Sequence, residues 1–273
     1  MTHQRASELY QTGDLDGAIA AAEDTVKASP TDTTVRGLLC EFLCFAGEID
    51  RADKHLDLIA DQDSTVAAGV ALFRQLLRGE TWRHEVFAQG RPPELLSDPP
   101  AHLQTALKAL TVLREGADRQ ARSLCEQVEA IRPAAAGGTR DDAQFGDLRD
   151  LDDITASVLE LITSTGEYYW IPWEQVVWLQ FAAPRRPRDL IWRKAEVAVR
   201  GGPEGVVYIP ALYPGSASSG DDAIRLGRAT DWPDPGEGPM RGVGQRTLLF
   251  DETDIPFLEL RDITFDGGEE TCP

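Results

Sequence analysis

The sequence predicts an α+β fold, with an N-terminal tetratricopeptide-like α-helical repeat domain followed by a mixed, antiparallel-rich α/β domain. Two observations support this prediction. A glycine-led motif recurs in the first half, and short apolar runs separated by Gly, Pro and Asp replace helical periodicity in the second. We expect the repeat domain over residues 1–133, a linker over 134–146 and the second domain over 147–273.

The glycine-led motif occupies residues 13–18, with the sequence Gly-Asp-Leu-Asp-Gly-Ala, and residues 47–52, with the sequence Gly-Glu-Ile-Asp-Arg-Ala. The two copies lie 34 residues apart, which is the tetratricopeptide period. In each copy we expect the glycine to end one helix, the acidic residue to cap the next and the alanine to let the two helices pack closely. A third copy of this layout begins at Gly116.

One further repeat is degenerate. Around Gly79 we expect a first helix over residues 66–78 and a short second helix over residues 81–89. Tandem prolines at residues 92–93 and 99–100 then interrupt the array, because proline cannot continue a helix. The first half therefore predicts three regular helical hairpins and one irregular one. Such arrays present a concave face that grips a peptide or helix, and they also act as scaffolds; the sequence leaves both uses open.

The second half is predicted to begin with a helix. Leu151, Ile154, Val158 and Ile162 follow helical spacing, and Gly166 is expected to end this helix. Helices rarely separate the apolar runs beyond it, which favours an antiparallel sheet over a β-α-β arrangement. These β-rich runs cover residues 168–171, 176–181, 196–199, 206–209, 247–250 and 258–265. Residues 214–244 are rich in Gly, Pro, Ser and Asp and are expected to form a long surface loop.

The chain is strongly acidic, with 46 Asp and Glu against 27 Lys and Arg and a net charge of −19. Such a chain repels nucleic-acid phosphates and anionic membrane surfaces, so we expect neither as a partner. Two interpretations of the acidity stay open. It aids solubility, or it complements a basic protein partner.

The sequence shows no targeting segment and no apolar run of bilayer-spanning length, so we expect a cytoplasmic protein. The cysteines lack Cys-x-x-Cys spacing, and we expect them to be small core residues rather than metal or redox groups. The four cysteines are Cys40, Cys44, Cys125 and Cys272.

Groups suited to catalysis are scarce in the second half. All four histidines lie in the helical half, which removes the commonest general base and the commonest metal ligand from the second domain. Ser216 and its neighbours have no histidine to activate them. Gly242 and Gly244 lack the rest of a phosphate-binding motif. We therefore expect no enzyme activity, no cofactor and no metal site.

Asp147, Asp150, Asp152 and Asp153 form the densest carboxylate cluster of the chain. One interpretation is a cation site or a glycosidase-like acid pair, but the spacing does not match an EF-hand loop. The other is an acidic first turn of a helix, where the helix dipole favours negative charge and arginines pair with the carboxylates. We favour the second interpretation. The structural Asp/Arg network that we assign comprises Asp147, Arg149, Asp150, Asp153, Arg188, Asp189 and Arg193.

The tryptophans divide into two groups. Four lie in apolar runs and are expected in the core: Trp170, Trp173, Trp178 and Trp192. Trp232 lies in a polar stretch, so it is the aromatic residue that we expect to be exposed and functional. The residues that we assign to partner binding are Arg225, Arg228, Asp231 and Trp232.

Several motifs in this order resemble the ImpE family, also called TagJ, of bacterial type VI secretion. They include Gly-Glu-Tyr-Tyr-Trp-Ile-Pro at residues 166–172 and Pro-Arg-Asp-Leu-Ile-Trp-Arg at residues 187–193. The other matching segments are residues 145–153, 209–213, 225–228 with 230–232, and 244–249. The resemblance covers nearly the whole chain, and it is specific because the motifs occur together. The acidic residues 266–273 are a departure to which the resemblance assigns no role.

The resemblance implies a non-enzymatic accessory protein that binds a helix of the small contractile-sheath subunit, TssB. It also implies, for some members, a link to the ClpV-type ATPase that recycles the sheath. Two other hypotheses stay open from the residues alone. The chain is an enzyme or ligand-binding protein that uses an Asp/Arg pocket in the second domain, or that domain is the docking surface of a larger assembly.

Overall fold

The computed structural model describes residues 2–134 and 137–266, and it confirms an α+β fold. The helical half contains α1 (Thr2–Thr12), α2 (Leu15–Ala28), α3 (Thr33–Phe45), α4 (Ile49–Gln62), α5 (Ala67–Gln89), α6 (Ala101–Arg114) and α7 (Asp118–Ile131). Gly13, Gly47 and Gly116 follow α1, α3 and α6 with φ angles of 91°, 73° and 77°. This left-handed conformation ends a helix and favours glycine, as the repeat motif predicts.

The degenerate repeat is one long helix, so the prediction of two helices separated at Gly79 is wrong. Helix α5 runs without a break through this residue. A Cβ atom on Gly79 would lie 2.4 Å from Cγ2 of Ile162, which belongs to a strand of the second half. The glycine therefore permits close approach of helix and sheet instead of ending a helix.

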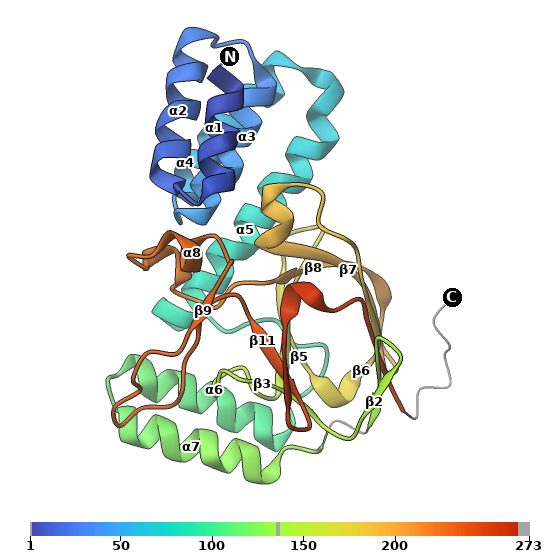
Figure 1. Cartoon of the computed structure of the whole chain (residues 1–273). Helices are drawn as coiled ribbons and strands as arrows, with labels where there is room; N and C mark the ends of the chain where they lie inside the picture. The colour runs from blue at the N-terminus through green and yellow to red at the C-terminus, as the bar shows by residue number, and fades with distance from the viewer. Residues whose placement is uncertain (1, 135–136, 267–273) are drawn as a thin grey trace.

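Helix α5 divides the helical array into two parts. In Figure 1, α1–α4 gather at the upper end of α5, and the α6–α7 hairpin lies at the lower end of the molecule. The proline-rich connection between α5 and α6 is held in place because Nε1 of Trp82 donates to the carbonyl of Pro92 at 2.9 Å. The three regular hairpins that we predicted are α1–α2, α3–α4 and α6–α7, and the proline-rich connection separates the last of them from α5.

The strands of the second half form antiparallel sheets. The larger sheet has eight strands in the order β2-β1-β13-β6-β7-β8-β4-β5, and a smaller one has the order β12-β11-β3. The main strands are β3 (Leu148–Asp150), β4 (Val158–Thr163), β5 (Tyr168–Pro172), β6 (Val176–Phe181), β7 (Trp192–Val199), β8 (Glu204–Pro210), β11 (Thr247–Phe250), β12 (Thr253–Pro256) and β13 (Asp262–Phe265). Strands β9 (Thr230–Asp231) and β10 (Val243–Gly244) form a separate pair.

Two predicted segments have a different structure. The helix expected over residues 151–162 is a turn followed by β4, and Gly166 lies in the β4–β5 turn with a φ of 87°. Strand β4 is buried on both faces, and such a strand shows a continuous apolar run that resembles a buried helix. The segment expected as a linker contributes β1 (Gly138–Arg140) and β2 (Ala143–Phe145) to the large sheet.

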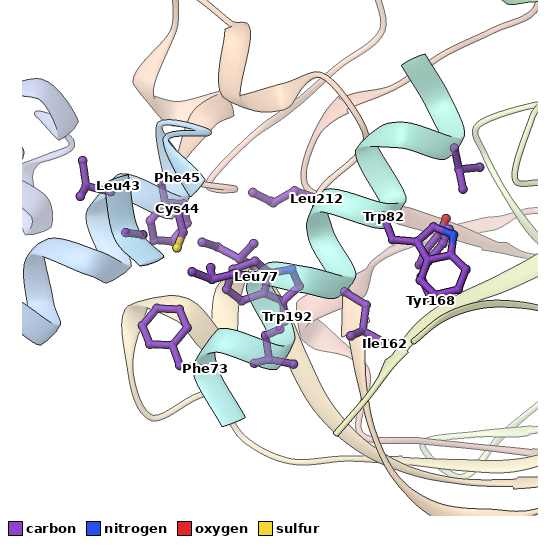
Figure 2. Packing of buried hydrophobic residues seen from close by; sticks show 14 of the residues in the cluster. Leu43, Cys44, Phe45, Phe73, Leu77, Trp82, Ile162, Tyr168, Trp192 and Leu212 are labelled. Carbon is purple, nitrogen blue, oxygen red and sulfur yellow. The ribbon is translucent and has the colours of Figure 1, made fainter. Parts of the chain in front are cut away.

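One hydrophobic core contains side chains from both halves. Phe73 and Leu77 of α5 belong to it, together with Ile162, Tyr168 and Trp192 of the sheet. Figure 2 shows these side chains on and around α5, and Phe45 of α3 belongs to the same cluster. A second core, which includes Phe250 and Phe257, lies within the β half. The four tryptophans predicted to be in the core are buried.

Replacing Gly79 with alanine is expected to lower the free energy of unfolding by about 1–3 kcal/mol, because the added methyl group overlaps Ile162. Gly69 is the matched control on the same helix, since no atom lies within 4 Å of the position that a Cβ would take there. Gly69→Ala should be neutral or stabilising by up to about 1 kcal/mol. Urea denaturation measures both. Equal midpoints for the two variants would contradict the steric argument.

Candidate functional site

A cleft of about 830 Å³ opens between the two halves of the protein. Its helical side is formed by the α3–α4 turn, the second half of α5 and the end of α6, and residues 212–218 line the opposite side. The larger apolar side chains in its lining include Phe45, Ile49, Phe87, Leu110, Leu113, Ile191, Trp192 and Leu212. The volume lies in the range of ligand-binding clefts.

Residues 212–218, which line the opposite side of the cleft, are held to the second half by hydrogen bonds. The amide of Tyr213 donates to the carbonyl of Gly244 at 2.9 Å, and the amide of Gly244 donates to Oγ of Ser216 at 2.7 Å. On the helical side, a Cβ atom on Gly47 would lie 3.1 Å from Cβ of Ala217. The α3–α4 turn and residues 212–218, which both line the cleft, therefore approach each other closely.

A buried charged cluster lies behind the cleft. Nε of Arg83 on α5 donates to Glu160 on β4 at 2.8 Å, and its Nη2 donates to the carbonyl of Leu212 at 2.9 Å. Arg246 forms a second ion pair with Glu160. Burial opposes ionisation of Glu160, but Arg83 and Arg246 outweigh it and lower the pKa of that carboxyl to about 2. One arginine thus joins helix, sheet and cleft wall.

Asp150 extends this cluster into the second half. Its carboxylate accepts hydrogen bonds from Arg246 at 2.6 Å, from the hydroxyl of Tyr213 at 2.7 Å and from Thr155 at 3.0 Å. Burial raises the pKa of Asp150, and Arg246 opposes this effect. Burial also raises the pKa of the Tyr213 hydroxyl well above its usual range. These groups satisfy one another inside the protein.

The aspartates of residues 147–153 form ion pairs with arginines, as predicted, but they do not lie in the first turn of a helix. Nη2 of Arg132 lies 2.5 Å from Asp147, and Nη2 of Arg149 lies 2.9 Å from Asp153. The cleft lining includes none of the aspartates of residues 147–153. These carboxylates therefore lie outside the cleft.

Arg188, Asp189 and Arg193 lie away from those aspartates. Arg188 lies over the ring of Phe73 at 4.3 Å, and its Nε is 3.8 Å from Glu41 of α3. Asp189 accepts hydrogen bonds from the backbone amides of residues 185 and 186. Arg193 donates to the carbonyls of residues 257 and 260, both at 2.6 Å. The structure thus divides the assigned network among separate places.

Arg225 and Arg228, which we assigned to partner binding, contact the helical half of the same chain. Nη1 of Arg225 lies 2.9 Å from Asp16, and Nη1 of Arg228 donates to the carbonyl of Gln11 at 3.0 Å. The helix α8 (Asp222–Arg225) is thereby fastened to the α1–α2 turn. Residues 214–244 are consequently more than a surface loop.

Trp232 packs edge-to-face against Tyr213 with ring centroids 5.5 Å apart, and it is half-buried. Asp231 is exposed, and its carboxylate accepts the amide of Trp232 at 2.9 Å. The contact of Trp232 with Tyr213 connects this loop to residues 212–218, which line the cleft.

The described part of the chain contains no cluster of His, Cys, Asp and Glu that could hold a metal ion, and no helix there is long and apolar enough to cross a membrane. Cys40 and Cys125 are buried, and burial raises the pKa of each thiol to about 12. Such thiols are poor nucleophiles. Cys272 and residues 267–273 of the acidic tail lie outside the described residues.

The sequence pattern missed Arg83, Glu160, Arg246 and Arg241; of these, Arg83 and Arg241 line the cleft. Glu160 had a signal, because it interrupts the apolar run of residues 158–162. Arg246 lies within the motif at residues 244–249. Arg83 on α5 carries no such mark.

Replacing Glu160 with glutamine leaves two buried arginines without their shared carboxylate, and we expect a loss of about 3–5 kcal/mol in unfolding free energy. Glu237→Gln is the control, because its pair with Arg119 is exposed and should be worth less than about 1 kcal/mol. Chemical denaturation compares the two. A Glu160→Gln variant as stable as the control would show that the buried pair does not hold the halves together.

Glu41 makes a pH-dependent contribution at the contact with Arg188. Burial raises the pKa of Glu41 to about 7 from 4.5, although Arg188 opposes the shift. The folded state therefore holds this proton more tightly, so wild type should lose stability relative to Glu41→Gln as pH rises from about 4.5 to 7. The slope is at most about 1.4 kcal/mol per pH unit. Thermal or urea unfolding between pH 4 and 8 measures it, and a pH-independent difference would refute the assignment.

Comparisons with known proteins agree with this architecture. The family model described as "ImpE protein" matches residues 142–264, and one described as "Tetratricopeptide repeat" matches residues 9–76. A curated protein of Pseudomonas aeruginosa, named type VI secretion system accessory component TagJ, is 34% identical over 261 residues. This match covers 96% of the present chain and 91% of the relative.

A solved structure has the same fold. The crystal structure of protein VPA1032 from Vibrio parahaemolyticus superposes with a TM-score of 0.88 at 26% identity, over 95% of this chain and 96% of that one. The sequence relationship to TagJ extends over both halves and therefore over the cleft between them. The chain belongs to the ImpE family.

Proposed function

We propose that this protein is a cytoplasmic, non-enzymatic accessory component of a type VI secretion system. In this proposal the cleft between its two halves binds an amphipathic helix of the small sheath subunit, a TssB-like protein. The observation that supports the proposal is the apolar cleft of about 830 Å³ between the helical half and the second domain. The name of the 34% identical relative supports the assignment to type VI secretion.

The shape and lining of the cleft suit a helix. A helix-in-groove contact places apolar side chains at positions i, i+3, i+4 and i+7 against a hydrophobic groove. Phe87 and Leu113 present partly exposed apolar surface in the cleft, so an occupant would remove this surface from water. The contacts of Arg83 with Glu160 and with the carbonyl of Leu212 hold both walls of the cleft in place. Such preorganisation lowers the entropic cost of binding.

The polar groups of the lining also favour an adaptor over an enzyme. Glu80 accepts hydrogen bonds from Arg83 and from Nε1 of Trp192 at 2.8 Å. His84 is the histidine of the lining, and the aspartates of residues 147–153 lie outside it. A link to a ClpV-type ATPase would use another surface, and it forms a second part of the proposal.

A synthetic peptide of the TssB N-terminal helix from the same secretion system tests the proposal by calorimetric titration into the full-length protein. We expect micromolar affinity, which corresponds to about −8 kcal/mol. Ala88→Glu places a charge in the cleft lining at an exposed position of α5, and it should weaken binding at least tenfold.

Ala68→Glu is the matched control, because residue 68 is exposed on the same helix but does not line the cleft. It should bind the peptide as wild type does. Absence of binding at high micromolar concentration by the folded wild-type protein would refute the sheath-helix proposal. Equal weakening by both substitutions would refute the cleft as its location.

A further inference from the structure

Arg241 stands on the wall of the cleft in a fixed position. Its Nε donates to Oδ2 of Asp152 at 2.7 Å, and its guanidinium carbon lies 5.6 Å from the ring centre of Phe87. Asp152 is fully buried and also accepts the amides of Ile154 at 2.9 Å and Gly242 at 3.2 Å. The arginine is thus held by an anchored carboxylate on one side and an aromatic ring on another.

The backbone beside Arg241 is fixed as well. The amide of Met240 donates to Oδ2 of Asp153 at 2.7 Å, and the amide of Asp153 donates to the carbonyl of Met240 at 3.0 Å. These bonds join the loop that carries the arginine to the turn that carries Asp152. The orientation of the guanidinium therefore exists before any partner binds, which reduces the entropy lost on binding.

The other arginines of the cleft lining have used their terminal nitrogens within the protein. Both Nη atoms of Arg51 contact carboxylates, and those of Arg83 donate to Glu80, Glu160 and a carbonyl. Arg114 donates from Nη1 to the carbonyl of Val86 at 2.8 Å and from Nη2 to Thr111 at 3.2 Å. They are thereby committed to holding the walls of the cleft.

Arg241 differs from them. Its hydrogen bond within residues 2–134 and 137–266 runs from Nε, and its Nη1 and Nη2 atoms have no acceptor there. The side chain is 28% exposed and lines the cleft. Both terminal nitrogens are accessible to water. Arginine carries five N–H donors, and only the Nε donor of Arg241 is used within the described residues.

An occupant that displaces this water must replace its hydrogen bonds, since buried donors without acceptors are costly. A purely apolar helix would leave Nη1 and Nη2 unsatisfied. A carboxylate fits best, because it accepts two parallel, charge-assisted hydrogen bonds from a guanidinium. The acceptor must also lie among apolar neighbours, given that Phe87 and Leu212 adjoin the same cleft.

We infer that the cleft recognises an amphipathic helix with an Asp or Glu within its apolar face, and that this carboxylate pairs with Nη1 and Nη2 of Arg241. The inference rests on the proposed function and specifies the chemistry of the partner. In this arrangement the apolar lining provides most of the affinity, and Arg241 sets the register of the helix and rejects helices that lack the acid.

The test is a double-mutant cycle between the protein and the sheath-subunit peptide described above. Each Asp or Glu of the peptide is changed in turn to Asn or Gln, and the dissociation constant is measured with wild type and with Arg241→Gln. One peptide change should weaken binding to wild type about 10- to 100-fold. The same change should have less than a twofold effect on binding to Arg241→Gln.

Two further variants separate recognition from folding. Asp152→Asn combined with Arg241→Gln removes the buried charge that Arg241→Gln alone would leave unpaired, and it should reproduce the same insensitivity to the peptide acid. Arg119→Gln is the matched control, because Arg119 is an exposed arginine that does not line the cleft. It should retain the full effect of the peptide substitution, and thermal unfolding verifies that each variant is folded.

The outcomes are distinct. Binding that is insensitive to every acid-to-amide change, or equally sensitive in wild type and Arg241→Gln, overturns the role of Arg241 but leaves the adaptor proposal standing. Tight binding of a peptide with no acid on its apolar face also overturns the role of Arg241 and leaves the adaptor proposal standing. Failure of the wild-type protein to bind any of the peptides overturns both proposals.

Discussion

The contact between helix α5 and strand β4 determines the arrangement of the whole protein. Gly79 lets the helix approach Ile162, and four residues further along the helix, Arg83 forms an ion pair with Glu160 on the same strand. The distance from glycine to arginine is about one helical turn, so both contacts lie on one face of α5. Because α1–α4 lie at one end of this helix and α6–α7 at the other, the contact fixes both hairpin groups relative to the sheet (Figure 1). The residues of α5 that follow Gly79 also line the cleft, so this contact positions the helical side of the cleft relative to the sheet.

A buried ion pair is an unusual way to join two halves, since removing charges from water is costly and an apolar contact of the same volume is often as stable. Its advantage here is positional. Glu160 accepts from Arg83 of the helix and from Arg246 of the second half, and Arg83 also donates to the carbonyl of Leu212 in the wall of the cleft. A shift of β4 by one residue would turn Glu160 to the other face of the sheet and break its ion pairs with both arginines. The charges therefore specify register and place the wall of the cleft.

The local features of this fold could be predicted from the sequence, whereas the features that depend on long-range contacts could not. Glycine at positions 13, 47 and 116 ends helices as predicted, because a left-handed residue is a local requirement. Gly79 resembles this helix-ending signal, but glycine is needed there because Ile162, which is distant in the sequence, leaves no room for a side chain. Strand β4 resembled a helix because burial on both faces removes the alternation that marks a strand. The sequence predicts partner binding for Arg225 and Arg228, but their acceptors are Asp16 and the carbonyl of Gln11 in the first hairpin. No local pattern indicates these acceptors, because they are distant in the sequence.

These internal contacts change how the net charge of −19 bears on recognition. The arginines that line the cleft are mostly bound to carboxylates of the same chain. The lining contains four arginines against three carboxylates, so the acidic excess lies elsewhere on the protein. Long-range attraction by an acidic surface accelerates encounter with a basic partner, but it is screened by salt and does not choose one helix among many. Discrimination has to come from groups that lose water on binding. Within the described part of the cleft, the terminal nitrogens of Arg241 are such groups. In our proposal, selectivity therefore rests on one fixed guanidinium, and the apolar lining around it provides the affinity.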